Sequence, residues 1–271
     1  MRPPRAPRTI ALRTLRDARR TLVGYSIALA LLTFMMGVFW PTIQDQGDEF
    51  QQLIENYPPA MQAFFGDFDE FTTPQGYLRA ELFSLMLPIL MLLFAIGRSA
   101  DTIAGDEERG ALDTLLALPV SRRRAFLEKA GGVALGLLVV VGVVAVSLIA
   151  IDVLFAMGVG VLGILAACLM LLLLALAHVG VTFALAGFRG RKGWVLSVAA
   201  TFAVASWLLA SFGNLVDALR PFRVISVFAH YNDVNALRDG LDPVGALVLL
   251  AVALAGVGLG LWLFERRDLA V

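Results

Sequence analysis

Residues 160–188 read GVLGILAACLMLLLLALAHVGVTFALAGF and contain no aspartate, glutamate, lysine or arginine. A helix needs about 20 consecutive apolar residues to cross a hydrocarbon core that is about 30 Å thick. This stretch exceeds that length, and only Cys168 and His178 interrupt it with titratable side chains. It therefore predicts a helix that spans a membrane.

Five further stretches of the chain have the same character. The 271 residues are 59% apolar and 16% charged, whereas soluble domains average about 45–50% and about 25%. This composition excludes a disordered tail, a nucleic-acid-binding domain and an ordinary soluble enzyme. We expect an all-α integral membrane protein, a single transmembrane domain over residues 1–271, with six spans: Leu22–Ile43, Tyr77–Ser99, Gly131–Met157, Gly160–Phe188, Trp194–Val216 and Val244–Phe264.

The N-terminal segment, residues 1–21, has an amphipathic pattern. Its apolar residues fall on one arc of a helical wheel, opposite an arginine-rich arc. We expect an interfacial helix that lies in the headgroup layer before the chain turns into the first span; a plain positive anchor is the alternative. The first span is too long for a cleavable signal peptide. The apolar arc consists of Ala11, Leu12, Leu15, Ala18 and Leu22.

The basic residues are distributed unevenly between the two sides of the expected bundle. Eighteen of the 22 lysines and arginines fall in residues 1–21, 98–129, 189–193 and 266–267. Because short cytoplasmic segments carry the excess of basic residues, both termini are expected in the cytoplasm. The 20 arginines against 2 lysines suggest a GC-rich prokaryotic genome, and so a prokaryotic plasma membrane.

Two longer segments are expected on the outer side. Residues 44–76 lack lysine and arginine, and their apolar spacing predicts two short amphipathic helices separated by Pro58-Pro59. Residues 217–243 contain an apolar run, Pro221 to Phe228, that could dip back into the bilayer. A re-entrant segment of this kind requires other helices to shield its backbone.

Residues 100–130, between the second and third spans, combine charge with an apolar pattern. Acidic residues there, Glu107 and Glu108 among them, favour a helix N-terminus, where they meet the positive end of the helix dipole. Pro119 ends that helix, and Ser121 can cap the next one. We expect a short helix held roughly parallel to the membrane on the cytoplasmic side.

The same helix carries a leucine-rich face made by Leu112, Leu115 and Leu116, next to Arg109. An exposed apolar face beside paired charges suits the docking of a soluble partner. The alternative is that the leucines rest on the lipid surface and the charges are solvated.

The run EERGALDTLLALPVSR at residues 107–122, followed by Lys129, resembles the corresponding loop of ABC-type-2 exporter permeases. Residues 225–228 stand near the Ser-Pro-Phe element of that family, although this chain has Val227 in place of proline. The ending Phe264–Leu269 resembles the family's usual basic pair followed by Asp and Leu. The resemblance covers the whole chain.

The resemblance implies a permease subunit that is not itself an enzyme. Two six-span units would pair, as two copies or with a sister permease, and each would dock on a separate cytoplasmic ATPase. Glu107, Glu108, Arg109, Leu112, Leu115 and Leu116 would supply that contact. No phosphate-binding loop is present, because Gly187–Gly193 has the wrong spacing. We therefore expect ATP and magnesium on the partner, and no catalytic residue, cofactor or metal ligand here.

A few residues inside the spans are candidates for the translocation path or for packing. Asp152 could line an outward cavity or simply reach the interface. For His178 a structural hydrogen bond is favoured over a ligand or proton role. Gly256 and Gly260 form a G-x-x-x-G pattern that permits close helix approach, favoured here within one bundle rather than between two chains.

Two other classes of membrane protein compete with this interpretation. An intramembrane protease fails, because its acid and histidines must meet at one depth, and His178 and His230 do not. A secondary transporter or channel-like six-span membrane protein without an ATPase partner remains the alternative. Secondary transporters, however, usually show repeated halves and several charges at mid-membrane depth. The transported substrate cannot be derived from the sequence, since the family handles drugs, lipids, peptides, ions and polysaccharides.

Overall fold

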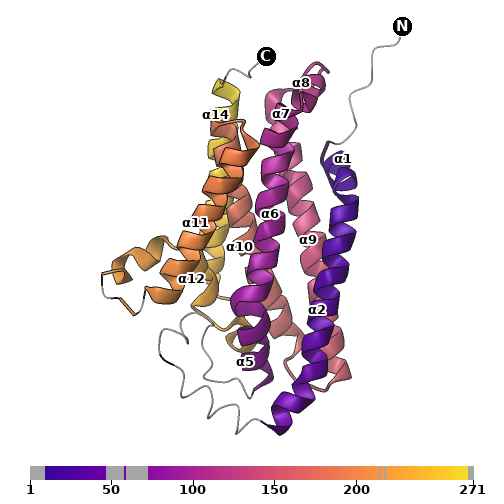
Figure 1. Ribbon diagram of the computed structural model, residues 1–271, viewed down its shortest axis with the longest axis vertical. Helices are drawn as coiled ribbons and strands as arrows, with labels where there is room; N and C mark the ends of the chain where they lie inside the picture. Colours follow the sequence, from indigo (N-terminus) through magenta and orange to yellow (C-terminus); the bar gives the residue numbers. More distant parts are fainter. Residues whose placement is uncertain (1–9, 47–57, 59–72, 214, 217, 268–271) are drawn as a thin grey trace.

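The protein is a bundle of six long apolar helices, seen in a computed structural model that describes residues 10–46, 58, 73–213, 215–216 and 218–267 (Figure 1). Over these residues it has helices and no strand. The expectation of an all-α integral membrane protein with six spans is confirmed. The spans are α2 (Arg19–Asp45), the continuous helix Pro74–Glu108, α9 (Arg122–Leu154), α10 (Val161–Phe188), α11 (Lys192–Phe212) and α14 (Pro243–Arg266).

The described chain begins in α1 (Ile10–Asp17) and ends after α14 at the same end of the bundle (Figure 1). We call this end the basic end; it also carries α7 (Asp106–Glu108), α8 (Ala111–Leu116) and the turn at residues 189–191. Two tryptophans lie there beside arginines, with Arg189 5.7 Å from the Trp194 ring centroid and Arg266 4.0 Å from that of Trp262. Tryptophan favours the membrane–water interface.

The second span is one helix built from five consecutive segments. These are α5 (Pro74–Leu78), the π-helical η1 (Arg79–Met86), α6 (Leu87–Ala100), the π-helical η2 (Asp101–Gly105) and α7. Thr73 caps its start by accepting a hydrogen bond from the Gly76 amide. The helix runs well beyond the apolar window from which it was predicted, and π-turns of this kind are frequent at functional sites.

The N-terminal helix α1 does not turn away from the first span. Amide hydrogen bonds from Ala18 to Thr14 and from Leu22 to Ala18 carry the helical ladder from α1 into α2. Ile10 and Ala18 are buried, and the Ile10 amide donates to the carboxylate of Glu128 in α9. The expected turn between α1 and the first span is therefore wrong. Leu15 packs against Gly136 of α9, whereas Leu12 of the predicted apolar arc is 55% exposed.

α10 is the central helix, and it packs closely on α14 (Figure 1). A Cβ atom on Gly256 would overlap the backbone of Gly180, and one on Gly187 would overlap the backbone of Gly260. The backbones touch because glycine lacks a Cβ atom. The expectation that the glycines of the last span pack within the bundle is confirmed.

At the opposite end, the segment after α11 contains η3 (Arg220–Ile225), α12 (Val227–Asn232) and α13 (Ala236–Asp239). Phe222, Val224 and Ile225 are exposed, whereas Val227 and Phe228 are buried against the long helices. Only the second half of the predicted re-entrant run is thus shielded by the bundle. The two helices expected in residues 44–76 fall outside the described residues.

Candidate functional site

The chain breaks its helical path at Gly110, between α7 and α8. Gly110 has φ +68°, and its amide donates to the Glu107 carbonyl at 3.0 Å. A glycine in this left-handed conformation ends a helix. Asp106, Glu107 and Glu108 therefore occupy the last turn of the second span, not the first turn of the next helix, and the expected position at a helix N-terminus is wrong. Negative charge is unfavourable at a helix C-terminus, so these acids need cationic partners.

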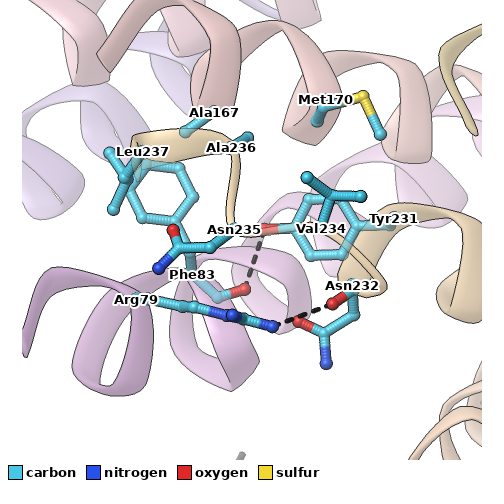
Figure 2. Close-up of a pocket in the computed structure, with 10 residues that line it drawn as sticks. All are labelled: Arg79, Phe83, Ala167, Met170, Tyr231, Asn232, Val234, Asn235, Ala236 and Leu237. Atoms are coloured by element: carbon cyan, nitrogen blue, oxygen red, sulfur yellow. Dashed lines mark hydrogen bonds between the residues drawn. The ribbon is translucent and has the colours of Figure 1, made fainter. Parts of the chain in front are cut away.

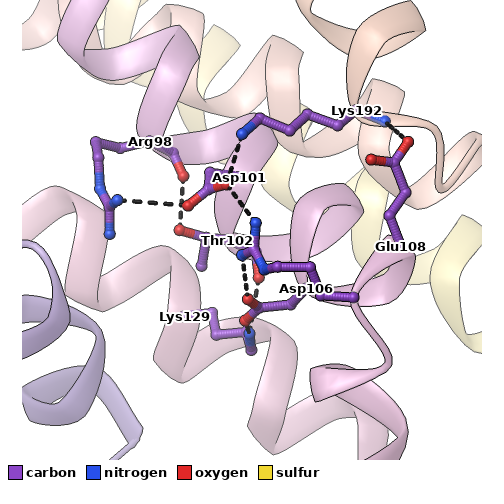
Figure 3. A network of polar contacts seen from close by, with 8 residues as sticks. Arg98, Asp101, Thr102, Asp106, Glu108, Lys129 and Lys192 are labelled. Atoms are coloured by element: carbon purple, nitrogen blue, oxygen red, sulfur yellow. Dashed lines mark hydrogen bonds and ion pairs between the residues drawn. The ribbon is translucent and has the colours of Figure 1, made fainter.

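A fourth acid, Asp101, lies one turn earlier in the same helix, and several cations surround it (Figure 3). Its carboxylate lies 2.9 Å from Arg109, 2.7 Å from the Lys192 ammonium and 3.5 Å from Arg98. Hydrogen bonds to Asp101 and Asp106 raise the pKa of Arg109 above its usual range, which keeps the guanidinium charged. Since Lys192 begins α11, Asp101 ties the second span to the fifth.

A second pair lies deeper in the same network. Lys129 of α9 is 3% exposed, and its ammonium donates to the Thr102 carbonyl at 2.7 Å and to the Asp106 carboxylate (Figure 3). Asp106 also accepts from Arg109 at 2.8 Å. A buried ammonium needs a paired charge and full hydrogen bonding. The pair therefore ties the second span to the third.

The remaining acids reach the α10–α11 turn and the end of α14. Glu107 pairs with Arg267, and its carboxylate occupies the space that a Cβ atom on Gly190 would need. Glu108 accepts from the Lys192 amide at 2.9 Å. Of the predicted docking charges, Glu107 and Arg109 are thus engaged in ion pairs within the chain and Glu108 in a backbone hydrogen bond. We use the term charge network for the ion pairs and hydrogen bonds formed by Asp101, Asp106, Glu107 and Glu108.

The leucine face of α8 points inward. Leu112 is 1% exposed and Leu115 is 8% exposed, the latter in a cluster with Ile10 of α1 and Ala125 of α9. Leu116 is half-buried. The expectation that these leucines form an exposed docking face is wrong for Leu112 and Leu115: Leu112 is buried in the main core, and α1 and α9 cover Leu115. The exposed side of α8 consists of Ala111, Asp113 and Thr114, with Ala117 just beyond its end.

Neither polar candidate inside the spans joins this network. Asp152 accepts from the amides of Val159 (2.8 Å) and Gly160 (3.2 Å), so it caps the turn between α9 and α10. His178 is buried in the middle of α10, where its Nδ1 lies 2.9 Å from the Leu174 carbonyl oxygen. The structure does not bring Asp152 and His178 together.

An apolar groove, which the sequence did not indicate, separates α6 from α11. Its volume is about 440 Å³, within the range of about 300–1,000 Å³ typical of small-molecule sites. Every lining residue is apolar or glycine. The residues that line it include Ile89 and Leu93 from α6, Ala200, Val204 and Trp207 from α11, and Phe228 from α12.

A much smaller cavity, lined by both polar and apolar side chains, lies at the opposite end (Figure 2). Arg79 donates to the Asn232 carbonyl at 2.9 Å, and the Tyr231 hydroxyl donates to the Phe83 carbonyl at 2.8 Å. The volume of about 20 Å³ has room for one water. These bonds fix α12 to the π-helical segment η1, so the cavity belongs to the scaffold.

The described residues contain no group of three or more His, Cys, Asp or Glu side chains that could hold a metal ion. Among known families, the model described as "Multidrug efflux system permease Rv1217c, C-terminal domain" matches residues 7–265. No curated protein matches the chain.

Proposed function

The chain belongs to the family of the multidrug efflux system permease Rv1217c C-terminal domain, and from that membership we propose that it is the permease subunit of an ABC exporter of the ABC-2 type. It is a multi-pass membrane protein of a transporter-permease family. On this proposal ATP and magnesium bind a separate cytoplasmic ATPase, two copies of which serve two permease units. This chain forms the path and performs no hydrolysis.

The observation that carries the proposal is the charge network behind α8. Asp101 reaches Lys192 in α11, Asp106 reaches Lys129 in α9, and Glu107 reaches Arg267 after α14. A partner that displaces α7 and α8 therefore pulls on three further spans at once. Coupling between distant sites travels through packed, bonded elements of this kind, and rigid-body rotation of whole units is a known form of such transitions.

On this proposal the predicted docking residues take different roles. Glu107, Glu108 and Arg109 transmit movement to the spans, because their side chains are engaged inside the chain. Leu115 anchors α8 on α1 and α9, Leu112 is buried in the main core, and Leu116 is half-buried against the Leu115 cluster. The ATPase would then contact the exposed side of α8, around Asp113 and Ala117, with the exposed arginines at residues 122–124 beside it.

The orientation follows from the positive-inside rule. Of the 19 lysines and arginines among the described residues, 15 lie at the basic end, so we place that end in the cytoplasm of a prokaryotic cell. The ATPase then meets α8 directly, and Asp152 and α12 lie towards the outer side.

The second permease unit, a copy or a sister chain, would cover apolar surface that a single unit leaves open. α2, α11 and α14 bury only a minority of the residues in their apolar windows, whereas α10 buries most of its own. The α6–α11 groove opens onto this exposed surface, and an apolar groove of this size suits lipophilic compounds. Paired units would thus enclose a path that includes the groove.

Affinity purification from membranes in mild detergent tests the proposal. We expect an ABC ATPase in stoichiometric amount, lost when Asp113→Arg and Ala117→Arg place two cations on the exposed side of α8. Arg220→Glu, an equally exposed charge reversal at the opposite end, is the control and should retain the ATPase. A monodisperse oligomer that never carries an ATPase would overturn the proposal in favour of a secondary transporter.

A further inference from the structure

His178 has one ring nitrogen without a partner. Its Nδ1 lies 2.9 Å from the Leu174 carbonyl oxygen. Because a carbonyl oxygen only accepts, this geometry assigns the proton to Nδ1 and leaves Nε2 with a lone pair. Nε2 is buried and has no hydrogen-bond partner among the described residues. The side chain is 1% exposed.

An unpaired buried acceptor is uncommon, since most buried polar side-chain atoms in native proteins have a partner. Such an atom raises the free energy of the folded state until a donor reaches it. The hydrogen bond of Nδ1 already holds the His178 side chain on α10, so Nε2 has no part in fixing it. Nε2 therefore needs a separate explanation.

Phe228 connects His178 with the apolar groove. Its ring centroid lies 6.1 Å from that of His178, and the same side chain lines the groove between α6 and α11. Phe202 packs on the imidazole as well, at 5.8 Å. One aromatic side chain is thus shared by the buried acceptor and the groove.

Hydrogen bonds fix the backbone at Phe228, whose side chain is 3% exposed. The Phe228 amide donates to the Ser206 hydroxyl at 3.1 Å, and the Ser226 hydroxyl donates to the Ser206 carbonyl at 2.7 Å. These buried bonds hold the start of α12 against α11. Because the Phe228 ring packs on the imidazole and also lines the groove, a ligand in the groove reaches Nε2 only if that ring turns aside.

We propose that His178 and the α6–α11 groove form one binding site for lipophilic compounds that carry a single hydrogen-bond donor, a hydroxyl or an N–H group. The apolar body fills the groove, and the donor bonds Nε2 once the Phe228 ring turns aside. His178 is then the residue that distinguishes such compounds from purely apolar ones. This inference rests on the proposed transport function, whose substrate class it names.

The test compares para-octylphenol with its methyl ether, which have the same apolar body and differ in the O–H donor. Binding to the purified protein in lipid nanodiscs is followed by quenching of the fluorescence of Trp207, which lines the groove. The Trp207→Phe variant and empty nanodiscs provide the background. We expect the phenol to bind about tenfold more tightly than the ether, the gain of one hydrogen bond to an unpaired acceptor.

Two variants assign that preference to His178. His178→Phe should bind the ether as the unchanged protein does and lose the preference for the phenol. Thr182→Val, one turn along α10, removes a buried hydroxyl that bonds the His178 carbonyl; it should keep the preference. Equal ether affinity in both variants shows that the groove is intact.

Three results would overturn the inference: no preference in the unchanged protein, a preference that survives His178→Phe, or no quenching of Trp207 by either compound. They are separable from failure of the proposed function. If the ATPase co-purifies while the preference is absent, the permease assignment stands and the site falls. If the preference is present without an ATPase, the site stands and the exporter assignment falls.

Discussion

Two helix pairs in this bundle meet in opposite ways. α10 and α14 touch through glycines, at Gly180 against Gly256 and at Gly187 against Gly260, so closely that no Cβ atom fits between them. α6 and α11 leave a groove of about 440 Å³ between them along part of their length. Both pairs are apolar, so the hydrophobic pattern does not distinguish them.

The difference lies in side-chain size at the contact and in what holds each pair. Between membrane helices, close packing of small residues supplies the attraction that water supplies in soluble proteins. The α10–α14 contact has that packing and no room to move. α6 and α11 are joined instead near the basic end, where Asp101 meets Lys192. One pair is a fixed seam, and the other can open if its ionic tie is altered.

The largest expected loss of stability comes from placing a larger side chain in the α10–α14 contact. Gly256→Leu places a side chain against the Gly180 backbone, which cannot turn aside as a flexible side chain could. We expect a loss of about 3 kcal/mol or more, at the upper end for overpacked cores. Gly258→Leu on the same helix meets nothing within 4 Å and should leave stability unchanged. Thermal unfolding in detergent measures both, and equal midpoints would show that the seam is not rigid.

A smaller effect is expected from the tie between α6 and α11. Asp101→Asn leaves Arg98, Arg109 and Lys192 facing a neutral amide, and we expect a loss of about 1–2 kcal/mol, because the site is partly solvated. The control Asp113→Asn removes an exposed carboxylate on α8 and should cost much less. Thermal unfolding of both variants measures the difference.

The same substitution should also loosen the groove. Spin labels at Ile89 and Val204, which line it from α6 and α11, report the separation of the two helices. The native Cys168 is buried, so the two introduced cysteines are the reactive ones. We expect a broader distance distribution in Asp101→Asn than in Asp113→Asn. An unchanged distribution would mean that packing alone sets the α6–α11 spacing.

The spans could be predicted from the sequence because a long apolar run has one stable arrangement in lipid. The charge network could not. The apolar window of the second span ends near Ser99, but its helix continues to Glu108, since a helix need not stop where the membrane does. Gly110 held the missing signal: a glycine after a run of helix-forming residues favours a C-terminal stop.

The leucines of α8 show a different limit. Their spacing correctly indicates that one face of the helix is covered, but periodicity does not say by what. Ile10 and Ala125 cover Leu115; Ile10 lies far from it in the sequence, and Ala125 belongs to the next helix, α9. The pairs Asp101–Lys192 and Glu107–Arg267 likewise join residues that no local pattern connects.

The smallest expected effect on stability gives the most direct comparison between the α6–α11 groove and the α10–α14 contact. Ala200→Leu enlarges a residue that lines the groove, a change of the same kind as Gly256→Leu in the seam. Because the groove has room, stability should stay within about 0.5 kcal/mol, while para-octylphenol and its methyl ether should both bind more weakly, by similar factors. Ala255→Leu, exposed on α14, is the control that should change neither. If Ala200→Leu instead destabilises the protein as strongly as Gly256→Leu, the groove is closed in the folded protein. The two helix pairs would then be equally tight, and movement would have to arise between permease units instead of within one.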